Sequence, residues 1–382
     1  MKKFMLPVML LISFIMESVL SFAGIIQHTA YYADTALAKA QAKLTENFQS
    51  PEHRYTDPAV YRLFLQQAPI MFPAYETLRT REDRTVEAGY RQMIGGSVST
   101  GRSHTHSGNY GTSGKLTPSW TTYSFPFAIS LKQADNNTYS HDEMNMNALE
   151  GMFKKLIEYN ETTATTYLMT NRSHVNACTF TNTNDDLGVF NGATFVHEIP
   201  ASTLSGLNNF NAMFGSSITT VMNINKYNGF SIVCDSIAWS KLNYIAAQGQ
   251  GNANNLSFQL NGVTYYHAIK LNALAVALGY TSGFAFAIPD GTIGCLPWIP
   301  KQNREGVSTK IQTYSSMINP FDNQLYAIHN YPTAVDGSGT GGYTQDELEQ
   351  YEGSIDLAFE HAPLSTSGET PIFAFAISGS IT

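Results

Sequence analysis

The longest regular pattern in this chain of 382 residues is a helical one over residues 140–172. Ser140 and Glu143 have the spacing of a capping box, which satisfies two backbone N–H groups at the start of a helix. Five apolar residues then recur at helical spacing and form one stripe: Leu149, Met152, Phe153, Leu156 and Ile157. Four charged residues lie largely off that stripe: Lys154, Lys155, Glu158 and Glu161. At about 1.5 Å per residue the helix would be about 45 Å long, so the sequence predicts a spine.

The second half of this helical pattern is less regular. Four of its residues are weak helix formers because a β-branched side chain loses rotamer freedom against the preceding turn: Thr162, Thr163, Thr165 and Thr166. We therefore expect the helix to fray or bend here before Tyr167 and Leu168 resume the apolar pattern.

Charged residues are scarce, and acidic residues outnumber basic ones. Asp, Glu, Lys and Arg make up 14% of the chain, and the net charge is -8. A protein that holds nucleic acid by its phosphates needs a basic field, so the composition disfavours a nucleic-acid reader. Asn, Ser, Thr, Gly and aromatic residues suit surfaces in polar contact with other protein. A neutral, β-rich soluble surface is the alternative interpretation.

Residues 1–24 have the pattern of a leader. Two lysines precede an apolar run over residues 4–16, and Ser21-Phe22-Ala23 follows, as in a secretory signal peptide. The run is short for a membrane span, and Pro7 and Glu17 interrupt it. An apolar N-terminal arm, or a start codon upstream of the true one, would give the same pattern.

The three cysteines do not suggest a metal site or a disulfide framework. Cys178, Cys234 and Cys295 lie far apart and form no C-x-x-C pair. We expect all three to be small buried hydrophobic residues, which leaves the redox compartment open.

Two short helices and a charged segment precede the long helix. Residues 34–48 are Ala-rich and helical in pattern, and residues 58–67 predict a second helix with Pro58 at its first position. Residues 76–91 interleave four arginines with acidic residues. This pattern indicates either a solvated face or an ion-pair network between subunits.

Residues 94–114 are too rich in glycine and polar residues to pack as a core element. Such a segment predicts a long exposed loop or an extended hairpin, and loops of this length tend to be functional. Because glycine makes ordering entropically costly, we expect a neighbouring molecule to order it.

Beyond residue 200, helical and strand patterns alternate. Helices are expected over residues 202–214 and after a capping Asp235, and strands over residues 230–234, 256–260, 263–267, 284–288, 354–360 and 371–377. Asn261-Gly262 predicts a two-residue type I′ hairpin turn, and Pro289-Asp290-Gly291 predicts another turn. Residues 337–342 form a flexible glycine-rich segment, and Thr344 begins a T-x-x-E pattern with Glu347. We expect the last two strands to pair with each other and to cover the apolar stripe of the long helix.

The chain shows no residue constellation typical of an enzyme. Gly114-Lys115 resembles part of a phosphate-binding loop, but Leu116 follows it and Asn109 stands where that motif has glycine. The nucleophile elbow G-x-S-x-G, the zinc motif H-E-x-x-H and the dinucleotide-binding fingerprint are absent, and Asp290-Gly291 lacks the carboxylates of a calcium loop. We expect no catalytic residues, no cofactor-binding residues and no metal ligands.

Other suggestive groups have simpler explanations. His104 and His106 would need a rigid loop to hold a metal, so we expect them to be exposed to solvent. Asp185-Asp186, and Glu347 with Glu349, are expected to be solvated loop charges. Four N-x-[ST] sequons arise by chance in a chain rich in Asn and Thr: Asn136, Asn160, Asn171 and Asn255.

The order of these elements resembles that of HK97-like major capsid proteins of tailed bacteriophages. The most specific match is residues 230–267, where a strand, a helix started by Asp235 with Trp239 and Leu242, a Leu-x-Gly turn and a second strand resemble the core of that family's A-domain. Residues 354–377 are similar to its closing P-domain hairpin, with a Pro shortly before an aromatic strand. The resemblance covers residues 30–382.

The resemblance implies an α+β fold, divided along the chain into six parts. These are a signal-like leader over residues 1–24, an N-terminal arm with helices over 25–90, an E-loop-like extended hairpin over 91–139, a spine helix with its P-domain over 140–190, a mixed α/β A-domain over 191–350, and closing P-domain strands over 351–382.

The implied function is that of a structural protein which self-assembles into an icosahedral viral shell enclosing DNA. Its partners would be further copies in hexamers and pentamers, scaffold, portal or decoration proteins, and DNA held without sequence-specific contact. The shell would assemble in the host cytoplasm, without a membrane or a cofactor. The leader and the Thr, Asn and Gly content leave an alternative, an exported β-rich bacterial surface or adhesin-like binding protein.

Overall fold

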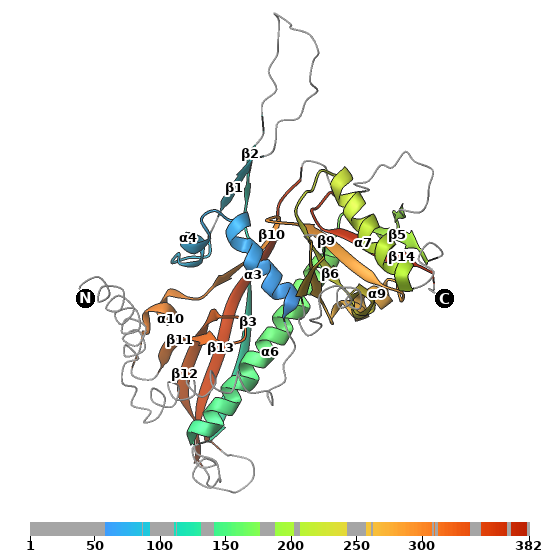
Figure 1. Cartoon of the computed structure of the whole chain (residues 1–382). Coiled ribbons are helices and arrows are strands. Elements are labelled where there is room, and N and C mark those ends of the chain that lie inside the picture. Colours follow the sequence, from blue (N-terminus) through green and yellow to red (C-terminus); the bar gives the residue numbers. More distant parts are fainter. Residues whose placement is uncertain are drawn as a thin grey trace, which may run out of the picture.

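The computed structural model describes most of the chain beyond residue 57. The described residues are 58–85, 87–91, 111, 113–130, 141–175, 188–201, 207–242, 257–260, 263–307, 309, 312–336, 345–364 and 368–379. They form a mixed structure of a five-stranded sheet, a seven-stranded sheet, a two-stranded sheet and several helices, and one helix runs from the tip of the five-stranded sheet to the seven-stranded sheet (Figure 1). Among the described residues, no helix is long and apolar enough to cross a membrane.

The long helix, α6, spans His141–Thr170 and confirms the predicted spine. Every residue of the predicted apolar stripe is buried. The expected fraying is wrong, because the helix continues without a break through its threonines. The hydroxyls of Thr162, Thr165 and Thr166 each donate to the backbone carbonyl four residues earlier, at 2.8 Å, which satisfies them inside the helix.

The first sheet has five strands: β3 (Thr121–Ser130), β10 (Ile293–Trp298), β11 (Thr313–Asn319), β12 (Gln324–Asp336) and β13 (Gln345–His361). All the pairings are antiparallel. Strand β13 is central, with β3 along one edge and β12 followed by β10 along the other. The T-x-x-E pattern at Thr344 therefore precedes a strand and begins no helix.

Helix α6 packs on this five-stranded sheet. Its stripe shares one hydrophobic cluster with sheet residues Tyr326, Tyr351, Ile355 and Leu357. The approach is closest at Gly353, where a Cβ atom would collide with the side chain of Met152. A glycine here lets the helix lie directly against the sheet backbone.

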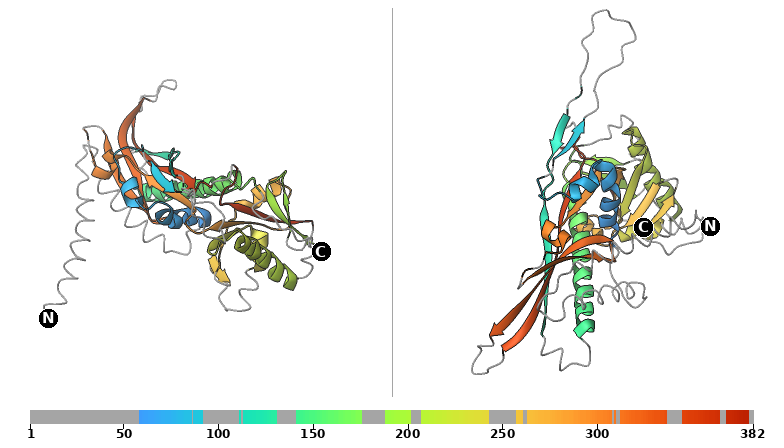
Figure 2. Two further views of the ribbon diagram at one scale, coloured as in Figure 1. Left: turned by 90° about the horizontal axis from the view of Figure 1, so that it is seen from above. Right: turned by 90° about the vertical axis from the view of Figure 1, so that its left-hand side faces the viewer.

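The second sheet has seven strands in the order β4-β5-β14-β9-β6-β8-β7. Their bounds are Val189–Asn191 (β4), Val196–Pro200 (β5), Phe230–Cys234 (β6), Ser257–Leu260 (β7), Val263–His267 (β8), Phe284–Pro289 (β9) and Phe373–Ser378 (β14). It lies on the opposite side of the molecule from the first sheet (Figure 2). Helix α7 (Leu207–Ile224) and a helix over residues 236–242 cover one face.

The predicted pairing of the two closing strands is wrong. Strand β13 belongs to the first sheet, whereas β14 lies between β5 and β9 in the second. Its Phe373, Phe375 and Ile377 join one core cluster, and Ala374 and Ala376 join the other. Strand β14 is apolar on both faces, so other residues must cover both of them. A position in the interior of the seven-stranded sheet buries both faces. Strands β10, β11 and β12, which precede residue 350, join β13 in the first sheet.

Strands β9 and β14 carry the same pentapeptide, Phe-Ala-Phe-Ala-Ile, at residues 284–288 and 373–377. They run antiparallel in a register that places each Phe opposite an Ala, for example Phe375 opposite Ala285 and Phe284 opposite Ala376. Alternating large and small side chains fill both faces of the sheet without crowding. The register therefore follows from side-chain volume.

Several local predictions in this half of the chain are confirmed. Strand β6 has the predicted bounds, and the N–H of Ala238 donates to Asp235 Oδ1 at 2.8 Å, so Asp235 caps the following helix. Strands β7 and β8 pair up to Leu260 opposite Val263, which leaves a two-residue connection. Cys234 and Cys295 are buried free thiols, and burial raises the pKa of both. The helix expected over residues 202–214 is instead α7, which extends to Ile224.

Helix α3 spans Ala59–Met71, four residues beyond the predicted end, and Pro58 is its N-cap rather than its first residue. The N–H groups of Val60 and Tyr61 donate to the two carboxylate oxygens of Glu161, at 3.2 and 2.8 Å. Glu161, expected off the buried stripe of the long helix, is therefore buried and caps a second helix. Its negative charge also meets the positive end of the α3 dipole.

Some sequence-based predictions lie outside the described residues. These are the leader over residues 1–24, the helix over 34–48, Ser140 of the capping box, His104, His106, Cys178, Asp185-Asp186, the sequons at Asn136 and Asn255, and the glycine-rich segment over 337–342.

Candidate assembly surfaces

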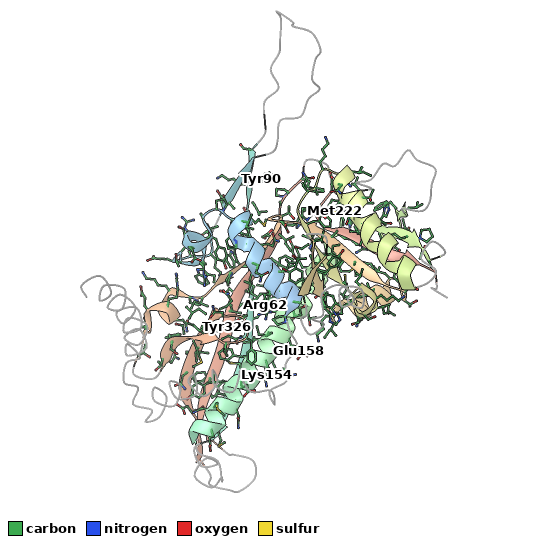
Figure 3. All side chains as sticks on the ribbon, viewed as in Figure 1. Arg62, Tyr90, Lys154, Glu158, Met222 and Tyr326 are labelled. Carbon is green, nitrogen blue, oxygen red and sulfur yellow. The ribbon has the colours of Figure 1, made fainter. Side chains whose placement is uncertain are left out.

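A two-stranded hairpin projects from the body. Strands β1 (Ala88–Arg91) and β2 (Ser113–Leu116) are antiparallel, and Tyr90 pairs with Gly114. The hairpin points away from both sheets, with Tyr90 beyond them (Figure 3). The Tyr90 ring covers Gly114 so closely that a Cβ atom there would collide with it. Most of the segment predicted as a long exposed loop or an extended hairpin, residues 94–114, lies outside the described residues.

The segment that leads into the hairpin is fastened to the body. Trp298 Nε1 donates to the carbonyl of Arg81 at 2.9 Å, and Arg304 donates to the same carbonyl at 2.6 Å. The Arg84 guanidinium lies 3.5 Å from Asp356 Oδ2 and over the Trp298 ring. The charged segment expected over residues 76–91 thus forms ion pairs within the chain. A fixed base orients the hairpin relative to the first sheet.

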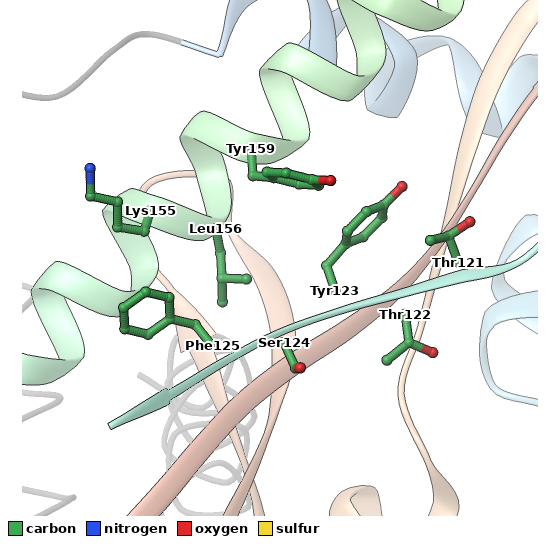
Figure 4. A pocket seen from close by; sticks show the side chains of 8 residues that line it. All are labelled: Thr121, Thr122, Tyr123, Ser124, Phe125, Lys155, Leu156 and Tyr159. Atoms are coloured by element: carbon green, nitrogen blue, oxygen red, sulfur yellow. The ribbon is translucent and has the colours of Figure 1, made fainter. Parts of the chain in front are cut away.

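A groove lies between α6 and β3 and has a volume of about 510 Å³. Its lining is shown in Figure 4: Thr121, Thr122, Tyr123, Ser124 and Phe125 from β3, and Lys155, Leu156 and Tyr159 from α6. Tyr159 is 58% exposed, and its ring centroid lies 5.4 Å from that of Tyr123. An exposed tyrosine ring packed on a partly buried one is a surface suited to contact with another molecule.

Strand β3 forms one edge of the five-stranded sheet. It pairs with β13 along its whole length, and no described strand pairs with its other side. Pro126 lies in the middle of β3, a residue that sheets accept at edges because it has no N–H to donate. The outer edge of β3 borders the groove.

A buried polar chain connects α6 to the turn between β11 and β12. Asn160 Nδ2 donates to the Tyr326 hydroxyl at 3.2 Å, and that hydroxyl donates to Asp322 Oδ2 at 2.8 Å. The N–H of Gln324 donates to Asp322 Oδ1 at 3.0 Å. Burial raises the pKa of Asp322 to about 6 despite these hydrogen bonds. The sequon Asn160 is thus a buried structural residue.

Replacing Asp322 by Asn is expected to flatten the pH dependence of stability. The fold raises the pKa of Asp322 from 3.8 to about 6, so its protonated form is favoured, and stability is lost as pH rises through that range. The full shift corresponds to about 3 kcal/mol. Urea unfolding at about pH 4 and about pH 7 measures the difference between wild type and variant. Equal pH slopes would contradict the assignment, and the exposed Asp83→Asn serves as the control.

The structure changes the expectation for Glu349 and gives Asp290, in its predicted turn, two hydrogen-bond partners. Glu349, expected in a solvated loop, is buried in β13 and accepts a 3.4 Å hydrogen bond from Asn330. Asp290 occupies the predicted turn, where it accepts hydrogen bonds from Gln67 at 3.2 Å and Ser231 at 3.1 Å. Both carboxylates join segments that are distant in sequence. Within the described residues, no group of three or more His, Cys, Asp or Glu side chains is arranged to hold a metal.

One polar cluster was missed by sequence reasoning. Ser236 Oγ lies 2.9 Å from His267 Nε2 and accepts a 2.7 Å hydrogen bond from Asn272, while the His267 ring stacks on Trp239. Burial lowers the pKa of His267. The cluster joins the helix after β6 to the end of β8, and only the spatial proximity of segments more than thirty positions apart reveals it.

Comparisons with known proteins find similarity at the level of structure. No family model matches the sequence, and no curated protein matches it. The capsid asymmetric unit of cyanophage Pam1 is 11% identical, with 87% of this chain and 95% of that chain covered and a TM-score of 0.48. A Mycobacterium phage Che8 structure is 9% identical, with 86% of this chain and 94% of that chain covered and a TM-score of 0.47. The capsid of Ralstonia phage GP4 is 7% identical, with 80% of this chain and 86% of that chain covered and a TM-score of 0.42. The chain is thus similar, over most of its length, to phage capsid structures.

Proposed function

We propose that this protein is the major structural subunit of an icosahedral viral shell, which assembles from copies of the chain and encloses DNA. The projecting β1–β2 hairpin is the observation that carries the proposal. An isolated two-stranded ribbon is marginally stable in water, and its strands pair with each other alone among the described residues. A ribbon that is fastened at its base, and whose strands pair only with each other within the described part of the chain, is suited to contact with a neighbouring molecule.

The division of the chain follows the HK97-like order as part of this proposal. The hairpin serves as the E-loop, α6 and the five-stranded sheet belong to the P-domain, and the seven-stranded sheet belongs to the A-domain. A neighbouring copy would order residues 94–114, which offsets the entropy of fixing their glycines. Hexamers and pentamers of the same chain then need no cofactor, metal or catalytic group.

The net charge of -8 is compatible with a shell around DNA. Such a shell confines DNA and has no need to neutralise its phosphates one by one. Scaffold, portal and decoration proteins are further proposed partners, and the virion is the proposed location, after assembly in the host cytoplasm.

Electron microscopy of the purified chain tests the proposal. Closed shells or curved lattice fragments are expected, either from the chain alone or after co-expression with the genes next to its own. A chain that stays monomeric under both conditions would contradict the proposal. That outcome would favour the exported surface-binding protein, which the leader-like pattern over residues 1–24 supports.

Assembly is expected to depend on the N-terminal arm. Deleting residues 34–48 removes an Ala-rich amphipathic segment and leaves both sheets intact in sequence. The truncated chain is expected to fold, as judged by an unchanged thermal transition, and to lose most of its shells in sedimentation. Complete shells at the yield of the full chain would show that the arm is no assembly element.

A further inference from the structure

We infer that the fold exposes Asn228 to spontaneous loss of its side-chain amide and protects Asn191 from the same reaction. Asn228 is thus a site of covalent modification, whether or not the chain forms a shell. Asparagine is among the thermolabile residues. It is most labile before glycine, because a residue without a Cβ atom leaves its backbone N–H open to the preceding side chain.

The chain contains three Asn-Gly pairs, at residues 191–192, 228–229 and 261–262. The third pair lies outside the described residues, and the first two differ in what holds the asparagine side chain. The surroundings of these two pairs therefore predict different reactivity at the same dipeptide.

The side chain of Asn191 is held at both ends of its amide. Its Oδ1 accepts a hydrogen bond from the N–H of Ala193 at 2.9 Å, the turn in which asparagine bonds to the backbone two residues on. Its Nδ2 donates to Glu198 Oε1 at 2.7 Å, and a hydrogen bond to a carboxylate is a strong one. The Cγ atom of Asn191 cannot turn towards the N–H of Gly192 without breaking these bonds.

The side chain of Asn228 has no such restraint. Residues 225–229 connect α7 to β6, and Asn228 is exposed there. Within the described part of the chain, the Asn228 side chain makes no hydrogen bond. The N–H of Gly229 likewise has no backbone partner among the described residues. The labile amide and the attacking nitrogen are therefore both available.

The reaction at Asn228 needs water alone. The backbone nitrogen of Gly229 attacks Cγ of Asn228 and forms a cyclic succinimide. The bond from Cγ to Nδ2 breaks, and Nδ2 leaves as ammonia with the proton of the glycine nitrogen. Water then opens the ring at either carbonyl, which gives aspartate or isoaspartate without oxidation or reduction. Each product has gained a carboxylate, which is ionised at neutral pH.

The packing around position 229 explains why glycine occupies it. A Cβ atom there would lie 3.1 Å from Asp290 Oδ2, a spacing at which the carboxylate would have to move. The carboxylate is fixed, because Asp290 Oδ1 accepts hydrogen bonds from Gln67 and Ser231. The fold thus requires at position 229 the residue that makes Asn228 labile.

The product changes a connection that is anchored on both sides of Asn228. The Tyr227 ring lies against that of Phe373, with the centroids 5.5 Å apart. The Gly229 carbonyl accepts a hydrogen bond from the N–H of Asp290 at 3.1 Å. Isoaspartate inserts one backbone carbon between these anchors. We expect it to weaken the junction between α7 and the seven-stranded sheet.

Peptide mapping by mass spectrometry tests the inference on the folded, full-length protein. The protein is kept at mildly alkaline pH, which favours loss of the glycine N–H proton, and conversion of amide to carboxyl is followed at each site. Asn228 is expected to convert about tenfold faster than Asn191 or more, because Asn191 must first release Glu198. Equal rates at the two sites in the folded protein would overturn the inference.

Unfolding in guanidinium chloride provides the matched control. Both asparagines then precede glycine in an unrestrained chain, so their rates are expected to converge. A difference that persists in the unfolded chain would show that neighbouring residues select Asn228, and it would overturn the protection that we assign to the fold.

Thermal unfolding of aged protein measures the consequence. Asn228→Gln is the matched variant, because its longer side chain closes the corresponding ring far less readily while other asparagines still react. Ageing is expected to lower the unfolding temperature of the wild type more than that of Asn228→Gln. Equal losses in the two proteins would contradict the expected weakening of the junction after α7.

Discussion

Phe153→Ala is expected to lower the free energy of unfolding by about 3–5 kcal/mol, the range for removing a fully buried aromatic side chain. Phe153 has no exposed surface, and its ring meets that of Tyr326 edge to face, with the centroids 5.5 Å apart. The substitution leaves a cavity between α6 and β12, because a helix held along its whole length cannot collapse into the space. Urea denaturation followed by circular dichroism measures the loss.

Tyr159→Ala is the matched control, since it removes an aromatic side chain from the exposed side of the same helix. It is expected to cost under about 1 kcal/mol. If Phe153→Ala costs as little as the control, the stripe of α6 does not form the core of the five-stranded sheet.

Glu161→Ala is expected to lower the free energy of unfolding by about 2–5 kcal/mol. The carboxylate of Glu161 is buried and accepts hydrogen bonds from the N–H groups of Val60 and Tyr61 at the start of α3. Its removal leaves two buried donors unsatisfied, at about 1–3 kcal/mol each. Loss of the negative charge at the helix N-terminus adds to the cost.

Glu161→Gln separates these two contributions. It keeps one oxygen as an acceptor but removes the charge, so an intermediate loss is expected. Glu158→Ala, on the more exposed side of α6, is expected to stay within about 0.5 kcal/mol of the wild type. Glu161→Ala with the stability of the wild type would mean that α3 is capped by another group.

The local elements of this protein could be predicted from its sequence because their signals lie within a few residues. The stripe from Leu149 to Ile157 repeats at helical spacing, and α6 has that stripe on its buried face. Asp235 follows a strand and precedes apolar residues at helical spacing, and it caps the next helix. Strands β7 and β8 flank Asn261-Gly262 and pair as expected.

Predictions that a given side chain is exposed to solvent failed where a segment distant in the sequence buries that side chain. Glu161 has the charge of a surface residue, yet α3 covers it from a hundred positions away in the chain. Glu349 lies in a charged stretch, and its burial follows from the pairing of β13 between β3 and β12. Threonine hydroxyls of α6 donate hydrogen bonds to backbone carbonyls of the same helix, and helix propensity alone does not reveal these bonds.

The candidate site was only partly accessible from the sequence. The glycine-rich stretch over residues 94–114 predicted a long exposed loop or an extended hairpin, and most of it lies outside the described residues, which include the paired strands β1 and β2. The groove could not be predicted, because Tyr159 and Phe125 meet there only when α6 packs beside β3. Nothing local to either residue indicates the other.

The sequence by itself determined the period of each element, and therefore which face of α6 is apolar and where the chain turns. The tertiary structure alone decided which strands are neighbours. Residues 354–360 and 371–377 look like one hairpin when read in order, but β14 completes the second sheet, where its Phe-Ala alternation fits that of β9. Strands β9 and β14 are about ninety residues apart in the sequence, and the complementary volumes of their side chains decided that they pair. Such complementarity exists only once the sheet is assembled.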